Sequence, residues 1–304
     1  MTDQYQAFTQ SPLGKFVVKN LGLPSPVSLD RFESGQPVVN GAVLLGAAPS
    51  STISAAIAQV LSNIHADSYV GNNVELQQTA AKVGLNLRPL NADDKESKFK
   101  AVVFDASGIQ NSEQLKELYN FFNPIARQIS NSGRVIVIGT TPETAKTVKQ
   151  AIAQRALEGF VKSVGKEFKK GITAQVVYVD QGAEANLEST LRFLISPRSA
   201  YVSGQVIRIS KAEIVKLDWA KPLAGKTALV TGASRGIGEA IAQVLARDGA
   251  HVICLDVPQQ QADLERVAGS IGGSVLAIDI TAADAGEKIK TAAAKLGGLE
   301  SIVH

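Results

Sequence analysis

Short apolar runs alternate with amphipathic stretches from Pro37 onward, and turn-forming residues separate them. Apolar runs of roughly four to eight residues between Gly or Pro breaks are typical of buried strands, whereas an apolar repeat of about 3.6 residues is typical of helices. The pattern predicts strands at 41–46, 100–105, 133–139, 174–179 and 205–209, and helices at 53–64, 112–130, 144–169 and 187–195. This alternation indicates a doubly wound α/β domain with a parallel sheet.

A second series of the same kind begins at Thr227. It predicts strands at 227–231, 250–255, 274–278 and 300–303, and helices at 236–248, 260–269 and 283–296. The intervening stretch mixes charges with Pro222 and Gly225 and has no clean period, which indicates a linker that Trp219 anchors to one of the domains. We therefore expect an α/β domain over 1–212, a linker over 213–226, and over 227–304 the first part of a second, incomplete sheet domain of the Rossmann or flavodoxin type.

The composition is that of a globular protein, with 304 residues, 45% hydrophobic and 19% charged. The net charge of +3 is spread without a basic cluster, so nucleic acid is not an expected partner. Cys254 is the only cysteine and the three histidines lie far apart, which argues against a disulfide framework and a metal site. No apolar run approaches the ~18 residues of a membrane span. We expect a soluble, cytoplasmic protein with no membrane span.

The most informative motif is TGASRGIG at 231–238, between a predicted strand and a predicted helix. Asp256 ends the following strand, and this combination indicates a dinucleotide-binding turn. In such a turn Gly232 permits the tight bend, Gly236 lets the main chain approach a pyrophosphate, and Gly238 lets the helix pack closely on the sheet. The helix N-terminus offers free N–H groups to the phosphates.

TGASRGIG, with three residues between the first two glycines, resembles the short-chain dehydrogenase/reductase family. Asp279 and Ile280 resemble the Asp-aliphatic pair that the family places beside the adenine ring, and GGLESIVH (297–304) resembles its fourth strand. The resemblance covers the chain from about Leu223 to His304. Within the family, GASRGIG and the preceding DWAKPLAGK (218–226) are most similar to FabG-type 3-oxoacyl-(acyl-carrier-protein) reductases of the long, two-domain form.

The resemblance implies a set of cofactor-binding residues: Gly232, Ser234, Arg235, Gly236, Ile237, Gly238, Asp256, Asp279 and Ile280. It also implies that a homo-oligomer transfers hydride from NADH to C3 of a 3-oxoacyl thioester on acyl carrier protein or coenzyme A. Asp256 is expected to bind the ribose hydroxyls and repel a 2′-phosphate, which favours NAD(H) over NADP(H), although Arg235 favours the reverse. The family's catalytic serine, tyrosine and lysine are expected after His304. No residue here is therefore assigned a catalytic role, and the 304-residue chain is expected to be inactive.

The hexapeptide AIAQVL occurs twice, at 56–61 and at 240–245. The flanks align, with Gly46 over Gly232, when two residues are inserted in the first loop. FDASGI (104–109) resembles the family's Asn-Asn-Ala-Gly turn, and GRVIVIGTT (133–141) resembles the strand that ends in its catalytic serine, with Thr140 at that place. The alignment continues into the next helix.

On this alignment Gln150 and Gln154 replace the family's tyrosine and lysine. The first domain therefore resembles a degenerate duplicate of the second, because a glutamine amide cannot act as the proton donor. A structural or interface role is favoured for it over residual nucleotide binding by Gly46–Ser51. Two other function classes stay open for the protein: an oxidoreductase with a different ketone substrate, and a nucleotide-binding or association module without turnover.

Overall fold

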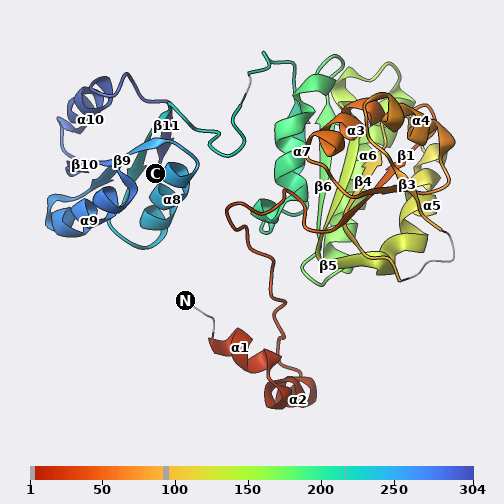
Figure 1. The fold of residues 1–304 in the computed structure, drawn as a ribbon, viewed down its shortest axis with the longest axis horizontal. Helices are drawn as coiled ribbons and strands as arrows, with labels where there is room; N and C mark the ends of the chain where they lie inside the picture. The colour runs from red at the N-terminus through yellow and green to blue at the C-terminus, as the bar shows by residue number, and fades with distance from the viewer. Residues whose placement is uncertain (1–3, 92–95, 216) are drawn as a thin grey trace. The chain divides into compact units, whose positions relative to one another are not determined.

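The computed structural model describes residues 4–91, 96–215 and 217–304. The chain divides into two compact units, Met1–Ile214 and Val215–His304, hereafter unit 1 and unit 2 (Figure 1). Residues 1–3 and 92–95, which fall in the expected first domain, and residue 216, which falls in the expected linker, lie outside the described residues. Trp219 is 39% exposed.

Unit 1 is built on a seven-stranded parallel sheet with the strand order β3-β2-β1-β4-β5-β6-β7. The strands are β1 (Ala42–Ala47), β2 (Ser68–Val70), β3 (Arg88–Pro89), β4 (Phe99–Asp105), β5 (Ile129–Thr140), β6 (Thr173–Val179) and β7 (Val206–Ile209). Every residue of β6 is buried, as expected for a central strand covered on both faces. The α/β fold class predicted from the sequence is confirmed.

Helices cover both faces of this sheet (Figure 1). They are α3 (Ser54–Asn63), α4 (Val74–Lys82), α5 (Lys116–Ile125), α6 (Val148–Glu167) and α7 (Leu187–Ile195). One apolar core joins the sheet to α3, α4 and α7, and the other joins it to α5 and α6. Single turns of 3₁₀ helix flank several of these helices: Glu113–Leu115, Ala126–Gln128, Pro142–Thr144, Glu184–Asn186 and Pro197–Ser199.

Two short helices, α1 (Gln4–Gln10) and α2 (Pro12–Leu21), precede the sheet and were not predicted. Ser11 caps α2, because its side chain accepts a hydrogen bond from the amide of Gly14, and Pro12 stands at the first helical position. Gly22 ends α2 in the left-handed conformation (φ 63°). Ser11, Pro12 and Gly22 are local signals for the ends of α2, but the pattern of apolar residues does not contain them.

Unit 2 contains a four-stranded parallel sheet with the order β10-β9-β8-β11. Its strands are β8 (Thr227–Thr231), β9 (His251–Asp256), β10 (Ser274–Ala277) and β11 (Ser301–Val303). Its helices are α8 (Gly236–Arg247), α9 (Gln261–Ile271) and α10 (Ala285–Ala294), with a 3₁₀ turn at Pro258–Gln260. Apolar residues of α8 and α9 pack on one face of the sheet, and those of α10 pack on the other.

The two units share one topology over their first four strands. The order β3-β2-β1-β4 in unit 1 is the same as β10-β9-β8-β11 in unit 2. Both copies of AIAQVL lie in the helix that follows the first strand, α3 in one unit and α8 in the other. The strand order and the place of the repeat are therefore the same in the two units, and the degenerate duplication stays a prediction.

The prediction differed from the structure mainly between residues 65 and 130. Strands β2 and β3 are three and two residues long, too short to produce a period-two pattern, and both were missed together with α4. The helix expected over 112–130 is shorter, because β5 already begins at Ile129, where it pairs with Phe99. Tertiary pairing therefore decided that boundary.

In the ranges that the structure describes, no helix is long and apolar enough to cross a membrane.

Candidate functional site

The carboxyl ends of β8, β9 and β11 surround a cavity of about 520 Å³. Ligands of doubly wound sheets bind at this edge, where the chain connections diverge to the two faces. The cavity is lined by Val230, Thr231, Gly232, Ser234, Arg235, Ile237, Gly238, Ile241, Asp256, Val257, Gln260, Val303 and His304. The glycine turn between β8 and α8 forms much of its wall.

Each glycine of the turn has a distinct steric role. Gly232 and Gly236 have left-handed backbones, with φ of 62° and 63°, and a Cβ at either would meet no atom within 4 Å. Their main chains are therefore uncovered on that side, as a turn that approaches a ligand requires. A Cβ at Gly238 would lie only 2.1 Å from the carbonyl oxygen of Gly232, so only glycine lets α8 start so close to the turn.

The N-terminus of α8 points its main-chain amides toward this turn. Arg235 precedes the helix with an extended backbone and makes no side-chain capping hydrogen bond. The first amides are thus not capped by that side chain and can bind an anion. Glu239 in the first turn pairs with Arg266 of α9 (Oε1–Nη1, 2.9 Å), and Arg266 also donates to the carbonyl of Ser234 (3.3 Å). Arg266 therefore braces the turn and offsets the negative charge of Glu239.

Asp256 ties the end of β9 to the glycine turn. Its Oδ2 accepts a hydrogen bond from the amide of Ser234 (3.2 Å), and its Oδ1 accepts one from the amide of Val257 (2.8 Å). Burial raises the pKa of Asp256, but the hydrogen bonds from Ser234 and Val257 outweigh this effect and hold the pKa below its ordinary value. A carboxylate therefore lines the cavity.

The structure brings together most of the predicted cofactor-binding residues but not all of them. Six line the cavity: Gly232, Ser234, Arg235, Ile237, Gly238 and Asp256. Gly236 lies in the same turn, whereas Asp279 and Ile280 follow β10 and do not line this cavity. The Oδ1 atom of Asp279 accepts hydrogen bonds from the amide and the hydroxyl of Thr281 (2.9 and 2.7 Å), and these hydrogen bonds lower the pKa of Asp279.

Several lining residues were not predicted from the sequence. They include Thr231, Val257, Gln260 and His304. The hydroxyl of Thr231 and Nδ1 of His304 are 2.9 Å apart and join the ends of β8 and β11. The positions of these residues at or just after strand ends could have predicted that they line the site, because the carboxyl ends of neighbouring parallel strands meet at one edge of the sheet.

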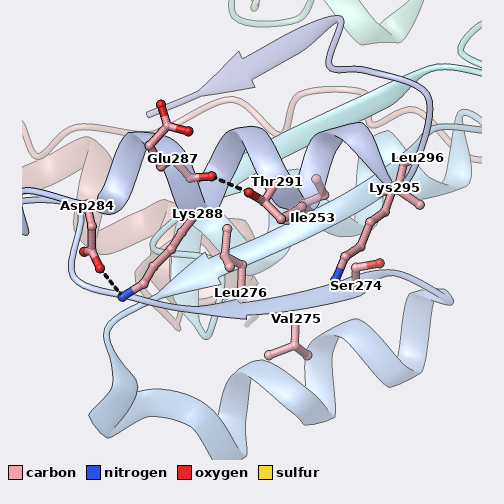
Figure 2. Close-up of a pocket in the computed structure, with 11 residues that line it drawn as sticks. Ile253, Ser274, Val275, Leu276, Asp284, Glu287, Lys288, Thr291, Lys295 and Leu296 are labelled. Carbon is pink, nitrogen blue, oxygen red and sulfur yellow. Dashed lines mark hydrogen bonds and ion pairs between the residues drawn. The ribbon is translucent and has the colours of Figure 1, made fainter.

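A second cavity, of about 630 Å³, lies between α10 and the strands β9 and β10 (Figure 2). Ile253, Leu276 and Leu296 supply apolar surface. Its charged groups include the ion pair between Asp284 and Lys288 (2.9 Å), and the hydroxyl of Thr291 donates to the main chain of Glu287. This second cavity shares no lining residue with the first and contains none of the glycine turn.

The residues of the first cavity fit a dinucleotide. Uncovered glycine main chain and uncapped helix amides suit a pyrophosphate, and the Asp256 carboxylate is an acceptor suited to ribose hydroxyls.

The match to a family model lies in unit 2. Residues 226–304 match the family model described as short chain dehydrogenase. The oxidoreductase UcpA of Salmonella typhimurium is 55% identical over 51 residues, which are 17% of this chain and 18% of that protein. Human dehydrogenase/reductase SDR family member 4 is 36% identical over 103 residues, which are 32% of this chain and 35% of that protein. The chain thus spans about a fifth to a third of the length of these relatives.

A solved short-chain dehydrogenase/reductase from Serratia marcescens aligns with 57% of this chain and 98% of its own, at 16% identity and a TM-score of 0.42.

Proposed function

We propose that unit 2 binds the adenosine diphosphate part of a nicotinamide dinucleotide and that the protein is an NAD(H)-dependent oxidoreductase of the short-chain type. The observation that carries the proposal is the cavity in which the glycine turn, the α8 N-terminus and Asp256 converge. The match of residues 226–304 to the short chain dehydrogenase model supports it independently.

Each part of the cavity has its own role toward the cofactor. The main chain of Gly232–Gly238 and the first amides of α8 would hold the pyrophosphate, and Asp256 would accept hydrogen bonds from the adenosine ribose. The nicotinamide, when bound, supplies or accepts a hydride. This chain's own residues bind and orient the dinucleotide, and the hydrogen bond from Ser234 keeps the Asp256 carboxylate in place.

The preference for NAD(H) over NADP(H) follows from charge. A 2′-phosphate would approach the Asp256 carboxylate. The repulsion between two like charges about 4 Å apart is roughly 1 kcal/mol in bulk water and roughly 4 kcal/mol near a protein surface. Arg235 also lines the cavity and would attract the same phosphate. We favour Asp256 as the stronger determinant, because a 2′-phosphate would also remove its hydrogen bonds to the ribose.

For the substrate we propose a 3-oxoacyl thioester on acyl carrier protein or coenzyme A, reduced at C3 by a homo-oligomer. This finer proposal rests on the similarity of GASRGIG and DWAKPLAGK to the two-domain reductases. The matched relatives bear the names of other oxidoreductases. Comparing turnover of acetoacetyl-coenzyme A with that of small ketones separates the two substrate classes.

The cofactor proposal is tested on the 304-residue chain by calorimetric titration with NADH, NADPH and ADP-ribose. We expect ADP-ribose and NADH to bind, and NADPH to bind more weakly. The control is Lys290→Ala, at an exposed position of α10 that does not line the cavity, which should bind as the wild type does. Absence of ADP-ribose binding to a folded chain would contradict the proposal.

A further inference from the structure

Unit 1 has a glycine-poor counterpart of the unit 2 turn, in the loop between β1 and α3. Gly46, aligned with Gly232, lies inside β1, and a Cβ there would be 2.2 Å from the ring of Phe121. The left-handed position of the loop is Ser50 (φ 60°). A Cβ at Gly108, in the loop after β4, would lie 2.1 Å from the carbonyl oxygen of Pro49. The two loops are therefore in direct contact where unit 2 has a cavity.

The buried carboxyl group of Asp105 occupies the start of α3, where burial raises its pKa against the opposing effect of its hydrogen bonds. Oδ2 of Asp105 accepts hydrogen bonds from the amide of Ile53 (3.1 Å) and the hydroxyl of Ser54 (2.7 Å). Its Oδ1 accepts one from the amide of Ser107 (3.0 Å), and the side chain is completely buried. A helix N-terminus binds anions through such donors, so Asp105 takes the position of an external anion.

The serines of the two loops use further donors and acceptors. The hydroxyl of Ser51 donates to the main-chain oxygen of Asp105 (2.9 Å), and the amide of Thr52 donates to the hydroxyl of Ser107 (2.8 Å). These contacts join residues more than 50 positions apart. Of the groups that could face a phosphate, the hydroxyls of Ser51 and Ser54 and the amides of Thr52 and Ile53 are therefore engaged within the protein.

Gln154 closes the adjacent strand ends. Its Nε2 donates to the carbonyl oxygens of Ala106 (2.9 Å) and Ile109 (2.8 Å), and its Oε1 accepts from the amide of Thr140 (3.0 Å). The side chain is completely buried, and a Cβ at Gly139 would lie 2.4 Å from its Oε1. The amide thus fills the space between the ends of β4 and β5.

Gln150, which the alignment places at the family's tyrosine, stabilises the start of α6. Its main-chain amide donates to the hydroxyl of Thr147 (3.1 Å), and its side-chain Oε1 accepts from the main-chain amide of Lys146 (3.0 Å). A small opening remains beside it, of about 200 Å³, lined by Asn111, Ser112, Glu113, Lys149 and Ile152. Ligand pockets typically measure roughly 300–1,000 Å³. This opening is too small for a dinucleotide.

We infer that unit 1 is a dinucleotide fold closed from within: the Asp105 carboxylate replaces the bound anion at the start of α3, and Gln154 seals the neighbouring strand ends. Each chain consequently binds one dinucleotide, in unit 2. The stoichiometry of one dinucleotide per chain rests on the proposed function of unit 2, whereas the closure of unit 1 does not.

The closure is tested by chemical rescue of Asp105→Ala with inorganic phosphate. The variant leaves the donors of Ile53, Ser54 and Ser107 without their carboxylate. Phosphate should therefore raise the melting temperature of the variant saturably, and by several degrees more than sodium chloride does at the same ionic strength. The wild type should gain less than half as much. Asp180→Ala is the matched control, since Asp180 lies at the same sheet edge but bonds to Thr141 and Ser210 instead. An equal gain for wild type and Asp105→Ala would overturn the closure.

A second measurement decides the question if Asp105→Ala does not fold. Wild-type chain is titrated with ADP-ribose, and so is Gly238→Val, in which the unit 2 turn is blocked. We expect one site per wild-type chain and none in Gly238→Val. Two sites in the wild type, or one remaining in Gly238→Val, would show that unit 1 is open. If the wild type binds none, unit 1 is still closed and the proposed function of unit 2 is what fails.

Discussion

Oδ2 of Asp256 lies 3.2 Å from the amide nitrogen of Ser234. This hydrogen bond connects the acid that ends β9 with the glycine turn that follows β8, two segments 22 residues apart. Cofactor preference and the shape of the turn are therefore linked, and a substitution at Asp256 is expected to affect both.

Replacing Asp256 with Ser should weaken NADH binding and reduce discrimination against NADPH. The like-charge repulsion of roughly 1–4 kcal/mol disappears, so the ratio of the two dissociation constants should fall at least about 5-fold. Titrations of both cofactors measure this ratio. Asp284→Ser, at the residue before α10 and outside the cavity, is the control and should leave the ratio unchanged. An unchanged ratio in Asp256→Ser would assign the preference to another residue.

Two glycines of unit 2 should respond oppositely to alanine. Gly238→Ala places a Cβ against the main chain of Gly232 and should destabilise unit 2 by about 1–3 kcal/mol. Gly269→Ala, within α9, meets no atom within 4 Å and should stabilise it by roughly 0.4–1 kcal/mol. Urea unfolding followed by the fluorescence of Trp219, the single tryptophan, reports on this unit. Equal effects of the two substitutions would refute the steric role of Gly238.

Restoring a lysine at position 154 should destabilise unit 1 rather than restore a site. The lysine cannot accept the hydrogen bond from Thr140, and its charge would be completely buried. We expect Gln154→Lys to lower the free energy of unfolding by roughly 2–5 kcal/mol. Gln59→Lys, on the exposed face of α3, should change it by less than about 0.5 kcal/mol. Circular dichroism during urea unfolding measures both. Wild-type stability in Gln154→Lys would contradict the assigned contacts.

Glu143 should make the stability of unit 1 depend on pH in acid. Hydrogen bonds from Arg208, from its own main chain and from Arg155 lower the pKa of Glu143 from 4.5 to about 2. A carboxyl whose pKa is lower in the folded state stabilises the protein above its unfolded pKa, and this contribution is lost as pH falls through the folded pKa. The stability difference between wild type and Glu143→Gln should thus be constant above about pH 5 and shrink between pH 4.5 and 2. A difference independent of pH would exclude this pairing in solution.

Cys254 should be protected from thiol reagents in the native protein. It is completely buried in β9, and burial raises the pKa of its thiol to about 11. Only the thiolate reacts readily, so native modification should be orders of magnitude slower than in denaturant and limited by opening of unit 2. An Ellman titration with and without urea measures this, with glutathione as the exposed reference thiol. Modification at the reference rate without urea would show that β9 is accessible.

The apolar pattern predicted the parts of the fold that local sequence determines. The helix expected over 187–195 is α7, and the strand expected over 227–231 is β8. Long strands and helices repeat their pattern often enough to be recognised, whereas β3 consists of only Arg88 and Pro89 and forms because β2 offers a partner. The existence of β3 therefore depends on its pairing with β2, which the local sequence does not show.

The sequence by itself determined the glycine turn and its acid, because Gly232, Gly238 and Asp256 act through backbone conformation and position at a strand end. Only the tertiary structure decided how Asp105 and Gln154 are used. Asp105 receives donors from residues 51 and 52 positions away, and Gln154 bonds to main chain 45 and 48 positions away. A carboxylate or an amide carries no local mark of such partners, since the order and register of the strands bring them within hydrogen-bonding distance.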